Sequence, residues 1–283
     1  MRTQRQSNRV SKPPASFSLI EMIGVLAIIV IVASIITPNL TRRISRANGD
    51  KEDDTLAILG DGLSRYVKAY QTVPGPNAWT TNIATMTGLP VKQVAYFNSD
   101  TNNARVYLIH AAFVPTNAAT TDPLWTQTSG GATSVTNARI LIISSQKSNL
   151  PLPVSSGKAS STAAFDAIWD WNFDPATKAP PSGWPAAWNG NGEYLHVQRI
   201  NLAAQFYRVT FSNSQFPSAY PSVQFGSSSN VTLNSTSAID AYYLQSTYLR
   251  LFKDSGSGGG LDLSYGVESA MNFLYESNRW RIP

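Results

Sequence analysis

The chain of 283 residues contains no cysteine, which excludes a disulfide framework, a thiolate metal site and a cysteine nucleophile. Histidine is scarce as well. His110 and His196 each lie in an expected strand, without an acidic cluster nearby, and are interpreted as structural. The sequence has no G-x-S-x-G or H-E-x-x-H motif. A Ser-His-Asp site stays open, because such triads assemble by geometry. The sequence therefore predicts a protein that is not an enzyme and needs no cofactor.

Charge is also scarce, with only 14% charged residues and a net charge of +5. Four of the positive charges lie in residues 1–16, which contain no acid, so residues 17–283 carry a net charge of +1. The body of the protein is nearly neutral, and the basic balance therefore does not indicate a nucleic-acid partner. The basic stretch is interpreted as a leader.

One long apolar run follows this leader, from Phe17 to Thr37, and Glu21 is its only ionisable side chain. As a helix the run would be about 31 Å long, enough to cross a bilayer. The basic leader places the preceding end in the cytoplasm, although Arg42 and Arg43 weaken this bias. Three hypotheses compete: a secretory signal cleaved near residues 33–34, a plain membrane anchor, and a helix retained after cleavage between Ser16 and Phe17.

The third hypothesis explains Glu21. A carboxylate near the centre of a bilayer costs roughly 2.5–3.5 kcal/mol, so such a residue usually has a partner. Cleavage after Ser16 would create a free amine on Phe17, four positions before Glu21. In an assembly of copies, Glu21 of one subunit could then neutralise the Phe17 amine of its neighbour and set their axial register.

Residues 16–40, SFSLIEMIGVLAIIVIVASIITPNL, resemble the N-terminus of type IV pilins and type II secretion pseudopilins. The family pattern is a basic leader, a cleavage point, Phe, a small polar residue, two aliphatic residues, Glu and a long apolar helix. Residues 17–21, FSLIE, match this order. Ser16 stands where the family usually has Gly before the cut. The resemblance covers about residues 9–70 and does not extend to residues 71–283.

The resemblance implies that a prepilin peptidase cuts after Ser16 and methylates the Phe17 amine. It also implies a structural subunit of a pilus or pseudopilus, closer to a pseudopilin of a type II secretion-like system. The expected partners are other pilin-like subunits in a homo- or hetero-oligomeric filament, an inner-membrane assembly platform and membrane lipid. The globular part would be periplasmic or extracellular. The alternative is a single-pass membrane-anchored extracytoplasmic binding module or enzyme, with carbohydrate as one ligand class.

The expected fold is α+β and pilin-like, with a long N-terminal helix packed on one face of an antiparallel sheet with loop-rich elaborations. The predicted parts are a leader (1–16), a membrane helix (17–38), an amphipathic continuation (39–72) and a mainly β globular domain (73–283). Pro38 predicts a helix break, and the Asn-Gly-Asp of residues 48–50 predicts a bend. Apolar residues at helical spacing between Leu56 and Tyr70 predict one buried face.

Strands and short helices are expected beyond residue 76. The stretch 77–100 predicts one or two short helices, 161–171 predicts an amphipathic helix, and the end of the chain predicts a final edge strand. Alternating apolar patterns between turn residues predict the remaining strands, at 104–110, 138–144, 193–200, 205–211, 222–226, 230–234, 247–252 and 271–277.

Two clusters are candidate binding sites. Asp254, Asp262 and Glu268 flank a glycine-rich segment and offer oxygen ligands to calcium, although acids in a loop are more often solvated. Four tryptophans could form a carbohydrate or partner platform, but core packing beneath a long loop is the commoner role. These four are Trp169, Trp171, Trp184 and Trp188.

Overall fold

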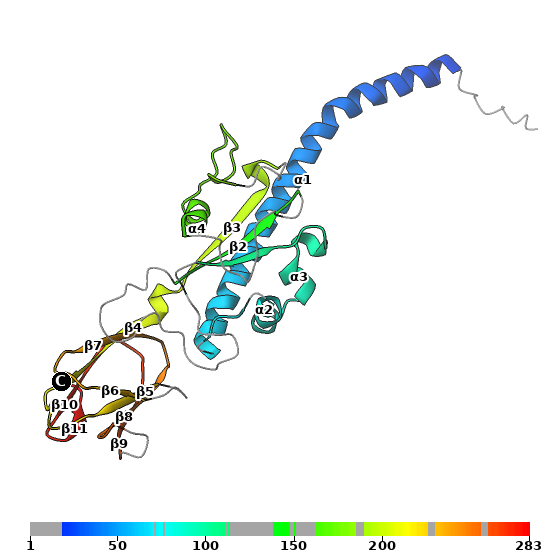
Figure 1. Ribbon diagram of the computed structural model, residues 1–283. Coiled ribbons are helices and arrows are strands. Elements are labelled where there is room, and N and C mark those ends of the chain that lie inside the picture. The colour runs from blue at the N-terminus through cyan, green and yellow to red at the C-terminus, as the bar shows by residue number, and fades with distance from the viewer. Residues whose placement is uncertain are drawn as a thin grey trace, which may run out of the picture. The chain divides into compact units, whose positions relative to one another are not determined.

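Helix α1 (Leu19–Tyr70) spans both compact units into which the chain divides, residues 1–48 and 49–283. The protein is described by a computed structural model (Figure 1). The described residues are 19–70, 72–75, 77–110, 113, 138–147, 150, 162–184, 190–225, 230–255 and 260–283.

The predicted interruptions of α1 are wrong, because the helix is continuous through residue 38 and through residues 48–50. Proline removes only one backbone hydrogen bond from a helix, and the bonds on either side can hold a long helix together. Gly49 is buried, and a Cβ there would lie 2.8 Å from Gln146 Nε2 and 3.1 Å from His196 Cε1. This glycine therefore permits close packing of α1 and does not end it.

The second half of α1 packs on a first sheet through one stripe of leucine and valine. Leu56, Leu59, Leu63 and Val67 are each at most 1% exposed, which confirms the predicted apolar face. The sheet has the antiparallel order β1-β2-β3. Its strands are β1 (Val106–Ile109), β2 (Arg139–Ser145) and β3 (Leu195–Asn201).

This first sheet is covered on both faces, whereas the sequence predicted only one buried face. Ile140 and Ile142 pack with the α1 stripe. Leu141 and Ile143 pack on the other side with Phe165 of helix α4 (Thr162–Trp169). A central strand buried on both faces needs a continuous apolar run, and residues 140–143 form one.

Short helices flank α1, as residues 77–100 predicted. Helix α2 (Trp79–Thr87) approaches α1 at Gly62, where an added Cβ would collide with the methyl group of Thr87. Helix α3 (Val91–Ala95) follows, and the 3₁₀ turns are η1 (Phe97–Ser99), η3 (Gly192–Tyr194) and η4 (Ala203–Gln205). The Trp79 and Tyr107 rings stack with their centroids 5.2 Å apart, linking α2 to β1.

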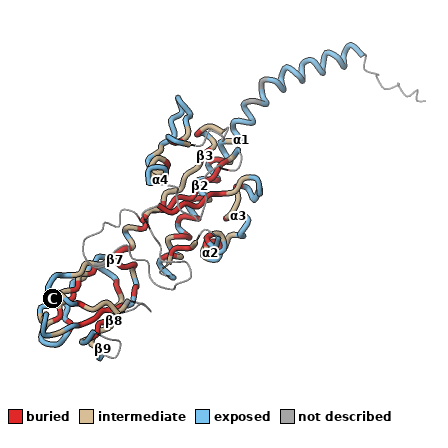
Figure 2. Tube along the Cα trace, viewed as in Figure 1, coloured by how far each residue is buried: buried red, intermediate tan, exposed pale blue. Residues whose placement is uncertain are grey.

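Two four-stranded sheets enclose a second core near the C-terminus, and we call residues 206–283 the C-terminal sandwich (Figure 2). One sheet has the order β11-β10-β4-β7, formed by Arg279–Arg281, Met271–Glu276, Phe206–Asn213 and Ile239–Leu244. The other has the order β6-β5-β8-β9, formed by Val231–Thr232, Ser222–Phe225, Tyr248–Phe252 and Leu261–Gly266.

The mixed α+β class is confirmed, and so are the predicted strands and the final edge strand. The long helix packs on an antiparallel sheet as expected, but that sheet is not the only one. Three sheets are present among the described residues, and β10 pairs with β4 in parallel, Phe273 opposite Phe211. A parallel pair needs a long crossover connection between its strands. The chain between β4 and β10 forms the other sheet of the sandwich, and this connection is long enough.

Candidate functional site

The first half of α1 is apolar on every side and exposed. Residues 19–34 are all exposed, and the large apolar side chains from Leu19 to Ile36, where described, are 47–78% exposed. Among the described residues, α1 is the one helix long and apolar enough to cross a membrane. A helix that is hydrophobic all round needs lipid or protein around it, unlike the amphipathic second half of α1.

Polar side chains in this segment bond to the helix itself. The Ser34 hydroxyl donates to the Ile31 carbonyl at 2.7 Å, and the Thr37 hydroxyl donates to the Ala33 carbonyl at 2.7 Å. Transfer of a hydroxyl into hydrocarbon costs free energy when it has no hydrogen-bond partner. These hydroxyls keep their partners in an apolar medium, because the bonds lie within the helix. The segment is therefore compatible with lipid despite its serine and threonine.

Glu21 lies exposed in the first turn of α1. Helix N-termini carry partial positive charge, which favours a carboxylate at this position. The predicted processing residues, Ser16 and Phe17, lie outside the described residues. At the other end of the apolar run, Arg42 and Arg43 are exposed and could meet lipid phosphates. The apolar segment thus has an acidic start and a basic end.

The predicted calcium ligands are not brought together. No group of three or more His, Cys, Asp or Glu side chains forms among the described residues. Asp262 Oδ2 accepts a hydrogen bond from the Trp280 backbone N–H at 2.6 Å, and its Oδ1 lies 3.5 Å from Lys253 Nζ. Asp262 therefore joins β9 to β11, and calcium binding with Asp254 and Glu268 stays a prediction.

Three of the four tryptophans cover the outer face of the first sheet. Trp169, Trp171 and Trp184 pack against the core that α4 shares with β1, β2 and β3. The Arg139 guanidinium lies 5.1 Å from the Trp169 ring centroid, and Arg199 donates to the backbone carbonyls of Trp169 and Trp171. These contacts agree with core packing. Trp188 lies outside the described residues.

His196 forms a pair with Asp53 that the sequence did not indicate. His196 Nδ1 lies 2.7 Å from Asp53 Oδ1, and His196 Nε2 lies 2.8 Å from Gln146 Nε2. An amide nitrogen donates, so imidazole Nε2 accepts and Nδ1 carries the proton that faces Asp53. In a catalytic triad Nε2 would face a hydroxyl nucleophile, but here it faces Gln146. With 143 positions between Asp53 and His196, no local pattern could have revealed the pair.

His110 follows β1 and is buried against Phe165, with ring centroids 4.9 Å apart in an edge-to-face contact. Its Nε2 lies 3.7 Å from Asp166 Oδ1, which accepts a 2.7 Å hydrogen bond from Arg139. Burial lowers the pKa of His110, the Arg139 charge lowers it further, and Asp166 opposes both effects. His110 is therefore a neutral core residue near pH 7.

Replacing His110 with phenylalanine is expected to flatten the dependence of stability on pH below neutrality. Because the pKa of His110 is lower in the folded state, the unfolded state takes up more protons, and stability falls as pH drops below the unfolded pKa of about 6.5. Urea-unfolding midpoints between about pH 5 and 7.5 measure this slope. The difference between the wild-type and His110→Phe slopes isolates this residue, and equal slopes would contradict the assignment.

Comparison with known proteins gives no match: no family model, no curated protein and no solved structure matches the chain significantly.

Proposed function

We propose that this protein is a structural subunit of a pilus or pseudopilus filament, most similar in role to a type II secretion pseudopilin. The observation that carries the proposal is Glu21, an acid in the first turn of an otherwise apolar helical segment whose described side chains are exposed. The proposed role is structural, not catalytic.

Two environments can cover the apolar segment. Lipid of the bacterial inner membrane surrounds it before assembly, and the corresponding helices of neighbouring subunits surround it in the filament. Transfer from lipid to a helical bundle gains little from the hydrophobic effect, because lipid tails are as apolar as leucine. Association therefore rests on packing and on contacts between polar or charged groups, and Glu21 is the one ionisable side chain between residues 17 and 37.

The charge partner proposed for Glu21 is the Phe17 amine of an adjacent copy, released when a prepilin peptidase removes residues 1–16. In a dry bundle, an unmatched carboxylate is costly, so a subunit that is out of axial register is disfavoured. An inner-membrane assembly platform would insert subunits one at a time, and residues 49–283, which bury their own cores, would decorate the filament surface.

The mature N-terminus tests this proposal. Mass spectrometry of protein from native membranes is expected to find a chain that begins at N-methylated Phe17. Retention of residues 1–16 would make the protein an ordinary tethered domain, and a start near Ile35 would indicate a secretory signal. Either result would overturn the proposal, because both remove the amine that Glu21 needs.

A further inference from the structure

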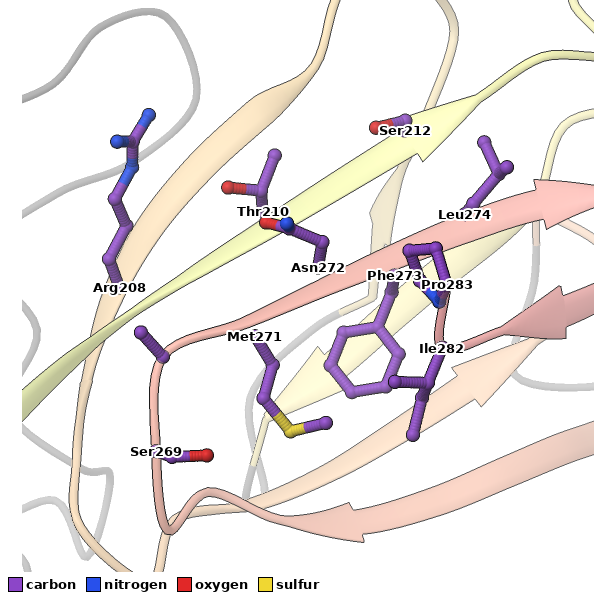
Figure 3. Close-up of a pocket in the computed structure, with 11 residues that line it drawn as sticks. Arg208, Thr210, Ser212, Ser269, Met271, Asn272, Phe273, Leu274, Ile282 and Pro283 are labelled. Carbon is purple, nitrogen blue, oxygen red and sulfur yellow. The ribbon is translucent and has the colours of Figure 1, made fainter.

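A trough of about 780 Å³ lies along the outer face of the β11-β10-β4-β7 sheet (Figure 3). Its volume is within the usual range for ligand sites. We propose that this trough binds a neutral oligosaccharide. The proposal is independent of the filament role, since it concerns only the C-terminal sandwich.

One side of the trough is a row of polar side chains. Alternation along β4 turns Val209 and Phe211 into the sandwich core and leaves Arg208, Thr210 and Ser212 on the outer face. Asn272 of β10 is paired in register with Thr210 and extends this row. The Ser212 hydroxyl and the Asn272 amide make no side-chain hydrogen bond to any described residue and are free for a ligand.

Neighbouring groups hold part of this row in place. Asp240 of β7 accepts from the Arg208 guanidinium at 2.5 Å and from the Thr210 hydroxyl at 2.7 Å. The hydrogen bonds from Arg208 and then Thr210 lower the pKa of Asp240, so it stays ionised near neutral pH. The Thr210 hydroxyl is thus held in one orientation, and its oxygen can still accept a hydrogen bond from a ligand. Fixing this side chain in advance reduces the entropy cost of binding.

The charged side chain that lines the trough is paired, and so is one on the adjoining strand. Arg208 is matched by Asp240, and Arg281 of β11 lies 3.0 Å from Glu276 of β10. A site for nucleic acid or another polyanion would instead present an excess of unmatched Arg and Lys. The side chains that line the trough offer hydrogen-bond donors and acceptors without an unmatched charge, which suits an uncharged polyhydroxylated ligand.

Apolar groups line the trough beside the polar row. Leu274 lies on β10 two positions after Asn272, on the same face of the sheet, and Ile282, which is 49% exposed, follows β11 (Figure 3). Sugar rings present hydroxyls at their edges and C–H groups on their faces. A polar row beside an apolar one matches both features, because hydroxyls can bond to Ser212 and Asn272 while a ring face contacts Ile282.

A peptide added as an extra strand does not fit this site. Strand addition needs unpaired backbone N–H and C=O groups at a sheet edge. Strand β4 pairs with β7 on one side and β10 on the other, and β10 also pairs with β11. The trough lies over these paired strands, so most of its contacts must come from side chains.

Titration calorimetry on the full chain in dodecyldimethylamine oxide micelles, a detergent without sugar, tests the proposal with chitotetraose and cellotetraose. At least one is expected to bind with a dissociation constant below about 1 mM. The double substitution S212A/N272A removes both free polar groups, so affinity should fall about tenfold. The matched control, N102A/S264A, removes the same two side-chain types outside the trough and should bind like wild type.

Three outcomes would overturn the proposal. The first is that neither tetrasaccharide binds at about 10 mM, roughly ten times the highest dissociation constant expected. S212A/N272A could bind as tightly as wild type while keeping its urea-unfolding midpoint, which would place the ligand elsewhere. A sulfated tetrasaccharide or an extended tetrapeptide could bind more tightly than both neutral sugars, which would assign the trough to another ligand class.

Discussion

Replacing Arg105 with methionine is expected to lower the free energy of unfolding by about 3–5 kcal/mol. Arg105 lies just before β1 and forms a bidentate ion pair with Glu52 of α1. Its Nε is 2.6 Å from Glu52 Oε1 and its Nη2 is 2.7 Å from Oε2. The two side chains are only 2% and 3% exposed. Removing the guanidinium would leave Glu52 as a buried carboxylate without its charge partner.

Arg105 also joins α3 to this pair. Its Nη1 donates to the Val94 carbonyl at 3.1 Å and to the Gln93 carbonyl. The substitution would therefore loosen the contacts that hold α1, α3 and β1 together. Urea unfolding of the full chain in micelles, followed by tryptophan fluorescence, measures the loss.

The double substitution E52L/R105M should recover much of that loss, because it removes both charges from the interior. A matched control is R281M, which breaks an exposed Arg–Glu pair and should cost no more than about 1 kcal/mol. If R105M and R281M lowered the unfolding midpoint equally, the buried pair would contribute no more than a surface one. A double variant less stable than R105M would show that Glu52 has a further stabilising role.

Local patterns predicted the helical face and most strands, because each depends on a short apolar repeat. The stripe from Leu56 to Val67 and the continuous run at residues 140–143 are patterns of this kind. Strand β7 was missed because Asp240 interrupts its apolar sequence. Asp240 is tolerated there because Arg208 and Thr210 hydrogen-bond to it from the neighbouring strand, a contact that spans about thirty residues.

Long-range geometry could not be predicted from local patterns. The sequence gives no reason to assign β4 and β10 to one sheet in parallel, or to divide three sheets among three cores. The same limit hid the Glu52–Arg105 pair and the trough, whose residues come from distant segments. Glu21 was recognised because its unusual feature is local: one acid within an apolar run.

Replacing Glu21 with alanine is expected to reduce incorporation into filaments at least about tenfold, the effect of losing roughly 1.4 kcal/mol of pairing free energy. The direction is informative because the substitution removes a carboxylate, which is unfavourable in a bilayer, by up to about 2.5–3.5 kcal/mol at its centre. The variant helix should therefore enter the membrane more readily than wild type. If apolar contact alone drove assembly, Glu21→Ala would assemble equally well or better.

The absence of native cysteine allows a clean measurement of contact between copies. A single cysteine at Val25, which is 54% exposed in the apolar segment, should give disulfide-linked dimers in native membranes when copies pack together. Adding Glu21→Ala should abolish most of these dimers. Adding Asp54→Ala, which removes an exposed acid from the second half of α1, should leave them unchanged.

The urea-unfolding midpoint of residues 49–283 within the full chain should be the same in all three variants, because the cores of these residues do not include the apolar segment. Undiminished dimers in the Glu21→Ala background would show that apolar packing is sufficient and that Glu21 does not direct assembly.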